Sequence, residues 1–109
     1  MSGMGGPGRV VALVPDLMDR SRLDRLGDVE VVHVATPQAL ADTAGVDDLV
    51  VVDLSRPGVL DVVGALPGPV VGFASHVDTA LLDAAREAGC QEVLPRSRFF
   101  STLTARLAR

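Results

Sequence analysis

Residues 48–58 read DLVVVDLSRPG, and this stretch decides the fold class of the chain. Its four consecutive apolar residues, 49–52, do not alternate with polar ones, so the strand that they form must be covered on both faces. Strands of this kind occur at the centre of parallel sheets. The run ends in Asp53, and Pro57 and Gly58 follow in a turn. Asp53 therefore lies where a buried strand opens to solvent, and we interpret it as a site residue.

Four further apolar segments accompany this one, and helical segments separate the five. We predict strands at residues 10–14, 29–34, 49–54, 70–74 and 92–94, and helices at about 18–26, 37–44, 58–66, 79–88 and 97–107. Parallel strands need crossover connections, and right-handed crossovers place helices on both faces of the sheet. The sequence therefore predicts an α/β fold, a three-layer αβα sandwich around a five-stranded parallel sheet.

Composition limits the number of domains and the kinds of partner. The 109 residues suit one domain, which we place at residues 9–109 after a flexible N-terminal tail at residues 1–8. The tail lacks the features of a signal peptide, and no apolar run approaches the ~18 residues of a membrane span. The net charge of −4 argues against a nucleic-acid partner. A single cysteine, Cys90, excludes an internal disulfide, so we expect a cytoplasmic protein.

In open α/β sheets the functional crevice lies at the carboxyl ends of the strands. The candidates there are Asp16 after the first strand, Asp53 after the third, Ser75 and His76 after the fourth, and Arg96 after the fifth. We do not interpret Ser75, His76 and Asp53 as a hydrolytic triad, because neighbouring side chains diverge at a strand end. No nucleophile-elbow pattern surrounds Ser75 either. We therefore predict that the protein is not an enzyme.

At these residues the sequence resembles the receiver domains of bacterial two-component response regulators, from residue 9 to residue 107. DLVVVDLSRPG looks like the family's third strand and following loop, and PVVGFASH is similar to its fourth strand. AREAGCQEVLPRSRFF is similar to its fourth helix, fifth strand and the start of its fifth helix. The resemblance implies a CheY-like, flavodoxin-like sheet of order 2-1-3-4-5 in a single receiver-like domain. It also implies that Asp53 stands at the phosphoacceptor position.

The chain departs from the family's pattern where receivers hold their metal ion. Val14 and Pro15 stand in place of the pair of acids that binds Mg²⁺ in the family, which leaves Asp16 and Asp53 as metal candidates. Mg²⁺ requires near-octahedral oxygen coordination, so we expect weak Mg²⁺ binding and no other cofactor.

The positions that contact the phosphoryl group differ as well. Ala74 stands at the family's hydroxyl position, with Ser75 one place later, and the family's lysine falls on Arg96. Ser75 and Arg96 are therefore the candidates for switch and phosphate contact. Because a guanidinium holds a carboxylate through two hydrogen bonds and stays protonated, we expect Arg96 to lock Asp53. Asp16 also has the position of a helix N-cap, and we favour that role.

We interpret the chain as an atypical receiver, or pseudo-receiver, a signalling module that acts through protein contacts without ordinary Mg²⁺-dependent phosphorylation. The family's partner surface comprises the fourth helix, the fifth strand and the fifth helix. It carries over to Asp83, Arg86, Glu87, Gln91, Arg98 and Arg106. Three alternatives stay open: a working phosphoreceiver that uses Asp53, a flavodoxin-like domain that binds a small ligand, and a scaffold that self-associates through weakly protected sheet edges.

Overall fold

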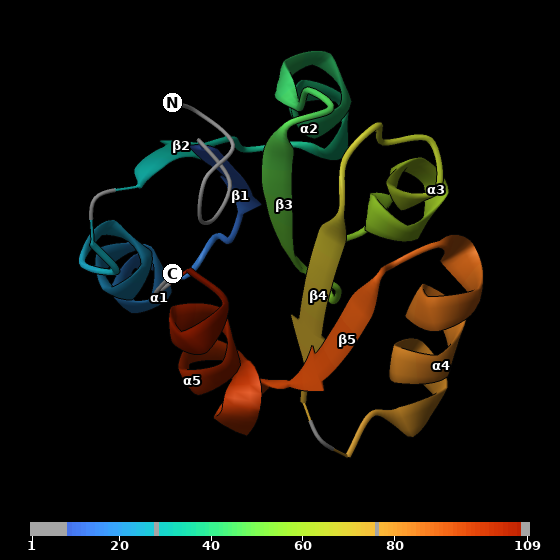
Figure 1. Cartoon of the computed structure of the whole chain (residues 1–109). Helices are drawn as coiled ribbons and strands as arrows, with labels where there is room; N and C mark the ends of the chain where they lie inside the picture. Colours follow the sequence, from blue (N-terminus) through green and yellow to red (C-terminus); the bar gives the residue numbers. More distant parts are fainter. Residues whose placement is uncertain (1–8, 28, 76, 108–109) are drawn as a thin grey trace.

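The computed structural model describes residues 9–27, 29–75 and 77–107, and for residues 106–107 it describes the backbone alone. Five strands and five helices alternate along this part of the chain (Figure 1). In chain order they are β1 (Arg9–Leu13), α1 (Leu17–Asp24), β2 (Glu30–His33), α2 (Pro37–Thr43), β3 (Asp48–Asp53), α3 (Val59–Val63), β4 (Val70–Ala74), α4 (Thr79–Ala88), β5 (Glu92–Pro95) and α5 (Arg96–Leu107). The predicted tail, residues 1–8, and His76 lie outside the described residues.

All neighbouring strands pair in parallel, and their order in the sheet is β2-β1-β3-β4-β5. This arrangement confirms the predicted fold class and strand order. Helices α1 and α5 cover one face of the sheet, while α2, α3 and α4 cover the other (Figure 1). Among the described helices, none is long and apolar enough to serve as a membrane span.

The central strand β3 supplies both hydrophobic layers, as its uninterrupted apolar run predicts. Leu49 and Val51 pack into the layer under α1 and α5, whereas Val50 and Val52 pack into the layer under the other three helices. Successive side chains of a strand point to opposite faces, so this division follows from the pleat. All four residues are almost completely buried, which places the following residue, Asp53, at the edge of the core.

Helix ends follow the cap residues that the sequence offers. The hydroxyl of Thr36 accepts a hydrogen bond from the Ala39 amide at 3.0 Å, and Pro37 occupies the first turn of α2. Helix α3 is shorter than the predicted 58–66, because Gly58, at a φ of 85°, precedes it and its β-branched residues disfavour a longer helix. Helix α5 begins at Arg96, one residue earlier than predicted, so Arg96 belongs to its first turn.

A polar cluster closes the amino-terminal edge of the sheet, opposite the predicted site. Asp48 is only 8% exposed, and its carboxylate accepts hydrogen bonds from Arg9 Nη2 and from the Gly45 amide, both at 2.7 Å. The Arg9 guanidinium therefore holds the pKa of Asp48 below its usual value, with the Gly45 amide acting in the same direction. The ion pair fixes β1 against β3, whose first residues are Arg9 and Asp48.

Candidate functional site

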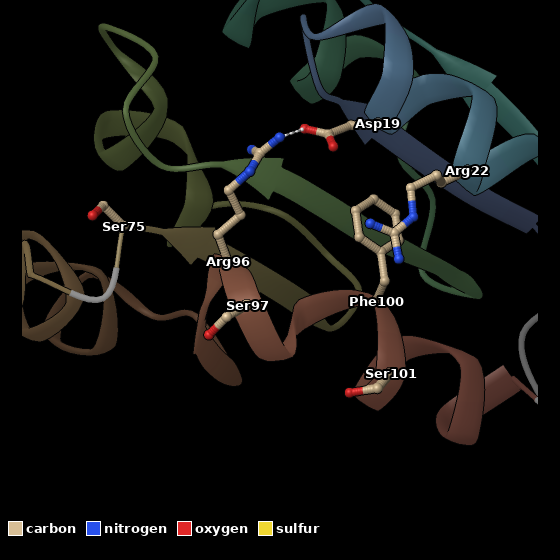
Figure 2. A pocket seen from close by; sticks show the side chains of 7 residues that line it. All are labelled: Asp19, Arg22, Ser75, Arg96, Ser97, Phe100 and Ser101. Carbon is tan, nitrogen blue, oxygen red and sulfur yellow. Dashed lines mark hydrogen bonds and ion pairs between the residues drawn. The ribbon is translucent and has the colours of Figure 1, made fainter.

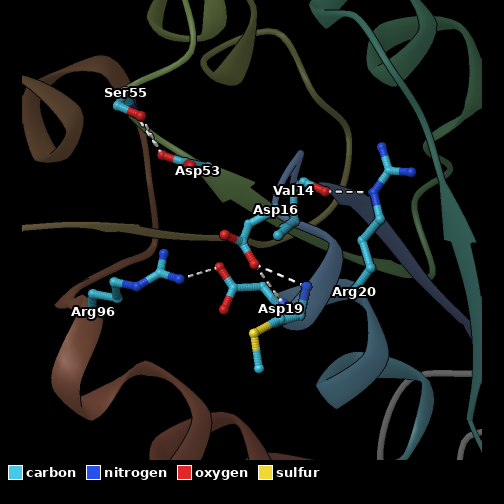
Figure 3. A network of polar contacts seen from close by, with 8 residues as sticks. Val14, Asp16, Asp19, Arg20, Asp53, Ser55 and Arg96 are labelled. Atoms are coloured by element: carbon cyan, nitrogen blue, oxygen red, sulfur yellow. Dashed lines mark hydrogen bonds and ion pairs between the residues drawn. The ribbon is translucent and has the colours of Figure 1, made fainter.

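The carboxyl end of β3 presents Asp53 in a tight local turn. Its Oδ1 atom accepts hydrogen bonds from the Ser55 backbone amide at 3.0 Å and from the Ser55 hydroxyl at 2.6 Å (Figure 3). The Arg56 amide also donates to the Asp53 carbonyl oxygen at 3.2 Å. Aspartate side chains commonly stabilise a turn two residues further on in this way. One oxygen of the predicted phosphoacceptor residue therefore organises the loop after the strand.

Asp16 caps the first helix. Its Oδ1 atom accepts hydrogen bonds from the backbone amides of Met18 at 2.9 Å and Asp19 at 3.0 Å, and its backbone is extended (Figure 3). These contacts satisfy amide groups that have no carbonyl partner within the helix. The favoured N-cap role of Asp16 is confirmed, and both hydrogen bonds of the cap use the same carboxylate oxygen, Oδ1.

An ion pair between a buried aspartate of α1 and a half-exposed arginine of α5 joins the two helices. Arg96 Nη2 lies 2.5 Å from Asp19 Oδ2, and the Asp19 side chain is only 5% exposed. Figure 3 shows the two side chains pointing toward one another from the two helices. The guanidinium carbon of Arg96 also lies 5.7 Å from the centre of the Phe73 ring. A buried carboxylate needs a counter-charge, and Arg96 supplies it.

The predicted lock between Arg96 and Asp53 is therefore wrong. Within the described residues no hydrogen bond or ion pair joins these two side chains, and Arg96 binds Asp19 instead. The physical reason is burial: Asp53 is partly exposed and already accepts two hydrogen bonds from Ser55, whereas the Asp19 carboxylate is enclosed and needs a cation.

The sequence interpretation missed Asp19. One signal was available, because Asp19, Leu23 and Leu26 have the spacing i, i+4 and i+7 of a helix face that packs against a core. Asp19 and Leu23 are both buried on this face of α1. An acid at a core position of an amphipathic helix predicts a cationic partner, although it does not identify Arg96.

Ser75 and Arg96 come together at a pocket between α1 and α5 (Figure 2). The pocket has a volume of about 480 Å³, and Asp53 is not among its lining residues. The exposed Ser75 accepts a long hydrogen bond, 3.5 Å, from the Val77 amide to its hydroxyl oxygen. Two of the predicted site residues therefore line a common cavity, while Asp16 and Asp53 lie outside it.

The acids of this edge fit a divalent cation poorly. Asp16 Oδ1 accepts two amide protons, Asp53 Oδ1 accepts two protons from Ser55, and Asp19 binds a guanidinium. Mg²⁺ needs several free oxygen ligands in octahedral positions. Across residues 9–27, 29–75 and 77–105, no three His, Cys, Asp or Glu side chains form a group that suits a metal ion.

The predicted partner surface is exposed where the structure describes it. Its exposed side chains are Asp83, Arg86, Glu87, Gln91 and Arg98. Arg86 Nη1 lies 2.8 Å from Asp83 Oδ1, one turn earlier on α4. The side chain of Arg106 lies outside the described part, so this member of the predicted surface is not placed.

The order of the strands and the two helical layers are those of a flavodoxin-like, CheY-like α/β fold. Three solved structures have the same fold. FixJ from B. japonicum matches with a TM-score of 0.75 and 23% identity, over 94% of this chain and 56% of that one. The chain thus spans little more than half the length of FixJ.

The other two structures are matched over nearly their whole length. A protein described as a response regulator from Chloroflexus aurantiacus J-10-fl has a TM-score of 0.73 and 17% identity, over 94% of this chain and 99% of that one. A CheY-like protein, tadZ, from Pseudomonas aeruginosa PAO1 has a TM-score of 0.63 and 23% identity, over 89% of this chain and 93% of that one. No protein-family model matches the chain, and no curated protein matches it significantly. These likenesses show a CheY-like α/β fold, as the sequence resemblance implies.

Proposed function

We propose that the chain is an atypical receiver module that signals through protein contacts and is not controlled by ordinary Mg²⁺-dependent phosphorylation of Asp53. The observation that carries the proposal is the ion pair between Asp19 and Arg96. It uses the cation at the family's lysine position to neutralise a buried acid of α1. In this chain the positive charge of Arg96 is therefore already balanced by the Asp19 carboxylate before any phosphoryl group arrives.

The chemistry of phosphoryl transfer supports the same conclusion. Transfer to a carboxylate depends on cations that neutralise the negative charge of the transferred group. Val14 and Pro15 offer no carboxylate for Mg²⁺, and Asp16 caps α1. Asp53 therefore has the family's position in the fold without the family's cationic surroundings.

Amide NMR spectra recorded with Mg²⁺ and beryllofluoride, an analogue of the phosphoryl group, test the proposal. We expect the amide signals around Asp53 to stay unchanged, because the described residues form no metal site that would hold the analogue against Asp53. Asp53→Ala serves as the matched control. Saturable shifts at Asp53, Ser75 and Arg96 that disappear in Asp53→Ala would instead identify a working phosphoreceiver and contradict the proposal.

The proposed contact surface is the exposed face of α4, β5 and α5, and we place the module in the cytosol, where its single thiol stays reduced. A charge reversal tests the surface: proteins that co-purify with the native chain should be lost with Arg98→Glu. They should be retained with Arg56→Glu, an exposed arginine in the loop after β3. Equal recovery with the two variants would argue against this face.

A self-associating scaffold is a second candidate, because β2 is an edge strand of the sheet. Glu30 is exposed at its start and supplies the charge that protects an edge from pairing with another chain. Light scattering over a range of concentrations tests this candidate. A mass that rises with concentration in the native chain, and rises further in Glu30→Val, would favour the scaffold, whereas a constant monomer mass would exclude it.

A further inference from the structure

The pocket between α1 and α5 gathers positive charge and hydroxyl groups in an acidic protein. Two guanidinium groups, three hydroxyls and one carboxylate line it, from Arg22, Arg96, Ser75, Ser97, Ser101 and Asp19 (Figure 2). Two cations against one anion leave one net positive charge at the pocket, although the chain as a whole carries −4. This local charge favours an anionic occupant.

Arg22 brings a second guanidinium to the pocket, and it stacks on an aromatic ring. Its guanidinium carbon lies 4.0 Å from the centre of the Phe100 ring, and Figure 2 shows the group lying across that ring. Within the described part of the chain, Arg22 takes part in none of the ion pairs. Stacking on an aromatic ring orients a guanidinium and leaves its N–H donors in the ring plane available.

Arg96 retains donors for a ligand on the opposite wall. It contacts Asp19 through Nη2, and its side chain is still 47% exposed. A guanidinium carries five N–H donors, so one contact to a carboxylate leaves most of them unused. Arg22 and Arg96 therefore frame the cavity from α1 and from the start of α5.

The first turns of α5 add polar groups to the lining of the pocket. Ser97 lies in the first turn of this 12-residue helix, where backbone N–H groups lack carbonyl partners and the helix dipole is positive. Ser101 lies one turn further on and also lines the pocket, but its hydroxyl donates to the Arg98 carbonyl oxygen at 3.2 Å, so it offers a ligand its oxygen as an acceptor. Hydroxyls, free helix amides and guanidinium groups are the donors that proteins use for phosphate oxygens.

We propose that this pocket binds a small phosphorylated molecule. Its volume, about 480 Å³, lies within the range of small-molecule sites. Two guanidinium groups and several hydroxyls suit a tetrahedral oxyanion with several acceptor oxygens better than a single carboxylate. Arg22 covers one face of the Phe100 ring and Phe100 is only 7% exposed, so the ring offers a nucleobase no free face. The inference does not depend on the proposed function, because Asp53 does not line the pocket.

Amide NMR titrations with inorganic phosphate and with pyrophosphate test the proposal, without Mg²⁺ and at constant ionic strength set with sodium chloride. We expect saturable shifts at Arg22, Ser97 and Ser101. Arg22→Gln should weaken binding by about tenfold, the usual effect of losing one charge-assisted contact. Arg98→Gln removes the same charge from an exposed position of α5 outside the pocket, so it should bind as the native chain does.

Asp53→Ala separates this inference from the proposed function, since it should leave phosphate binding unchanged. Two results would overturn the inference: shifts that sodium chloride alone reproduces, or equal weakening of phosphate binding in Arg22→Gln and Arg98→Gln. Either would show that the anion responds to the overall charge of the protein and not to this pocket. Shifts that disappear in Asp53→Ala would also overturn it, because they would place the anion at the end of β3.

Discussion

The Arg96 side chain binds a buried acid, lies near an aromatic ring and lines a pocket. Its Nη2 atom binds Asp19, its guanidinium carbon lies near Phe73, and the remainder of the group faces the cavity between α1 and α5. The two partners differ in exposure, because Asp19 is 5% exposed and Arg96 47%. The cost of breaking the pair therefore depends on which partner is removed.

Arg96→Gln should destabilise the protein more than Asp19→Asn does. The first change leaves an ionised carboxylate buried without a counter-charge, at a cost of about 2–3 kcal/mol in the free energy of unfolding. The second leaves a half-exposed arginine that water can solvate, at about 1 kcal/mol. Urea denaturation followed by circular dichroism measures both values. Arg98→Gln on the exposed side of α5 is the control, and equal losses in the two variants would contradict the asymmetry.

Asp48 should make stability depend on pH. Its pKa is lowered in the folded state, chiefly by the hydrogen bond from Arg9, so the ionised carboxylate stabilises the fold above the ordinary carboxyl pKa. This contribution decreases as the pH falls below about 4 and is lost below the folded-state pKa. We expect Asp48→Asn to lower the Tm by roughly 5 °C at neutral pH, and the difference to vanish in acid.

Thermal melts of Asp48→Asn at a series of pH values check this expectation. Asp47→Asn is the matched control, since Asp47 is the exposed neighbour and takes part in none of the ion pairs of the described residues. A difference between Asp48→Asn and the native chain that persists unchanged in acid would show that the carboxylate charge is not its cause.

At the residue scale, the sequence predicted roles that depend on neighbours along the chain. Asp53 ends a strand that is buried on both faces, and Asp16 precedes a helix, so both positions follow from local pattern. The pairing of Asp19 with Arg96 joins residues 77 positions apart. No local rule relates them, and the predicted pair with Asp53 failed because it assumed that nearby strand ends bring their side chains into contact.

At the scale of elements, β3 and β4 fit together closely around Gly72. A Cβ atom added to Gly72 would lie 2.7 Å from Leu54 Cδ2 and within about 3 Å of two further atoms of that side chain. Leu54 is only 2% exposed and is held by a hydrogen bond from its amide to the Phe73 carbonyl. The contact requires glycine in β4, and the side chain of Leu54 seals the loop after β3 against the sheet.

Gly72→Ala should cost about 1–3 kcal/mol in the free energy of unfolding, since overpacked cores force side chains out of their preferred rotamers. Combining it with Leu54→Val should cost less than the sum of the two single changes, because the smaller side chain relieves the contact. Urea denaturation of the two single variants and the double variant measures the coupling. Gly45→Ala, where the nearest atom is 3.4 Å away, is the control, and strictly additive losses would exclude the clash.

The existence of each element was predictable, while its length was less so. Thr36 and Asp78 are residue types that favour the start of a helix, and their side chains accept amide hydrogen bonds in the first turns of α2 and α4. Helix α3 has no side-chain cap and spans only Val59–Val63. Its β-branched residues disfavour a longer helix, but this preference does not identify the residue at which the helix ends.

At the scale of the whole molecule, the reactivity of Cys90 measures how often the fold opens and exposes this buried thiol. The thiol is buried between α4 and β5, and burial raises its pKa, so it stays protonated at neutral pH. We expect iodoacetamide to label the folded protein slowly, and the labelling rate to rise with urea in parallel with the loss of helical circular dichroism. Rapid labelling without urea would show that the α4–β5 connection opens on its own.

The topology was the most predictable property of the molecule. Apolar runs without alternation, such as Leu49–Val52, require cover on both faces, and helices between parallel strands provide it. The pocket between α1 and α5 was not predictable, because it depends on the stacking of Arg22 on Phe100 across two helices that are distant in sequence.

The long separation of Asp19 and Arg96 also constrains how the protein is made. Asp19 is synthesised 77 residues before Arg96, which opens the last described helix. A nascent chain that ends after β4 has the central strands of the sheet but no cation for Asp19. Its first helix cannot seal onto the sheet without burying a bare charge. Arrival of α5 therefore completes both the aromatic layer and the charge balance of α1.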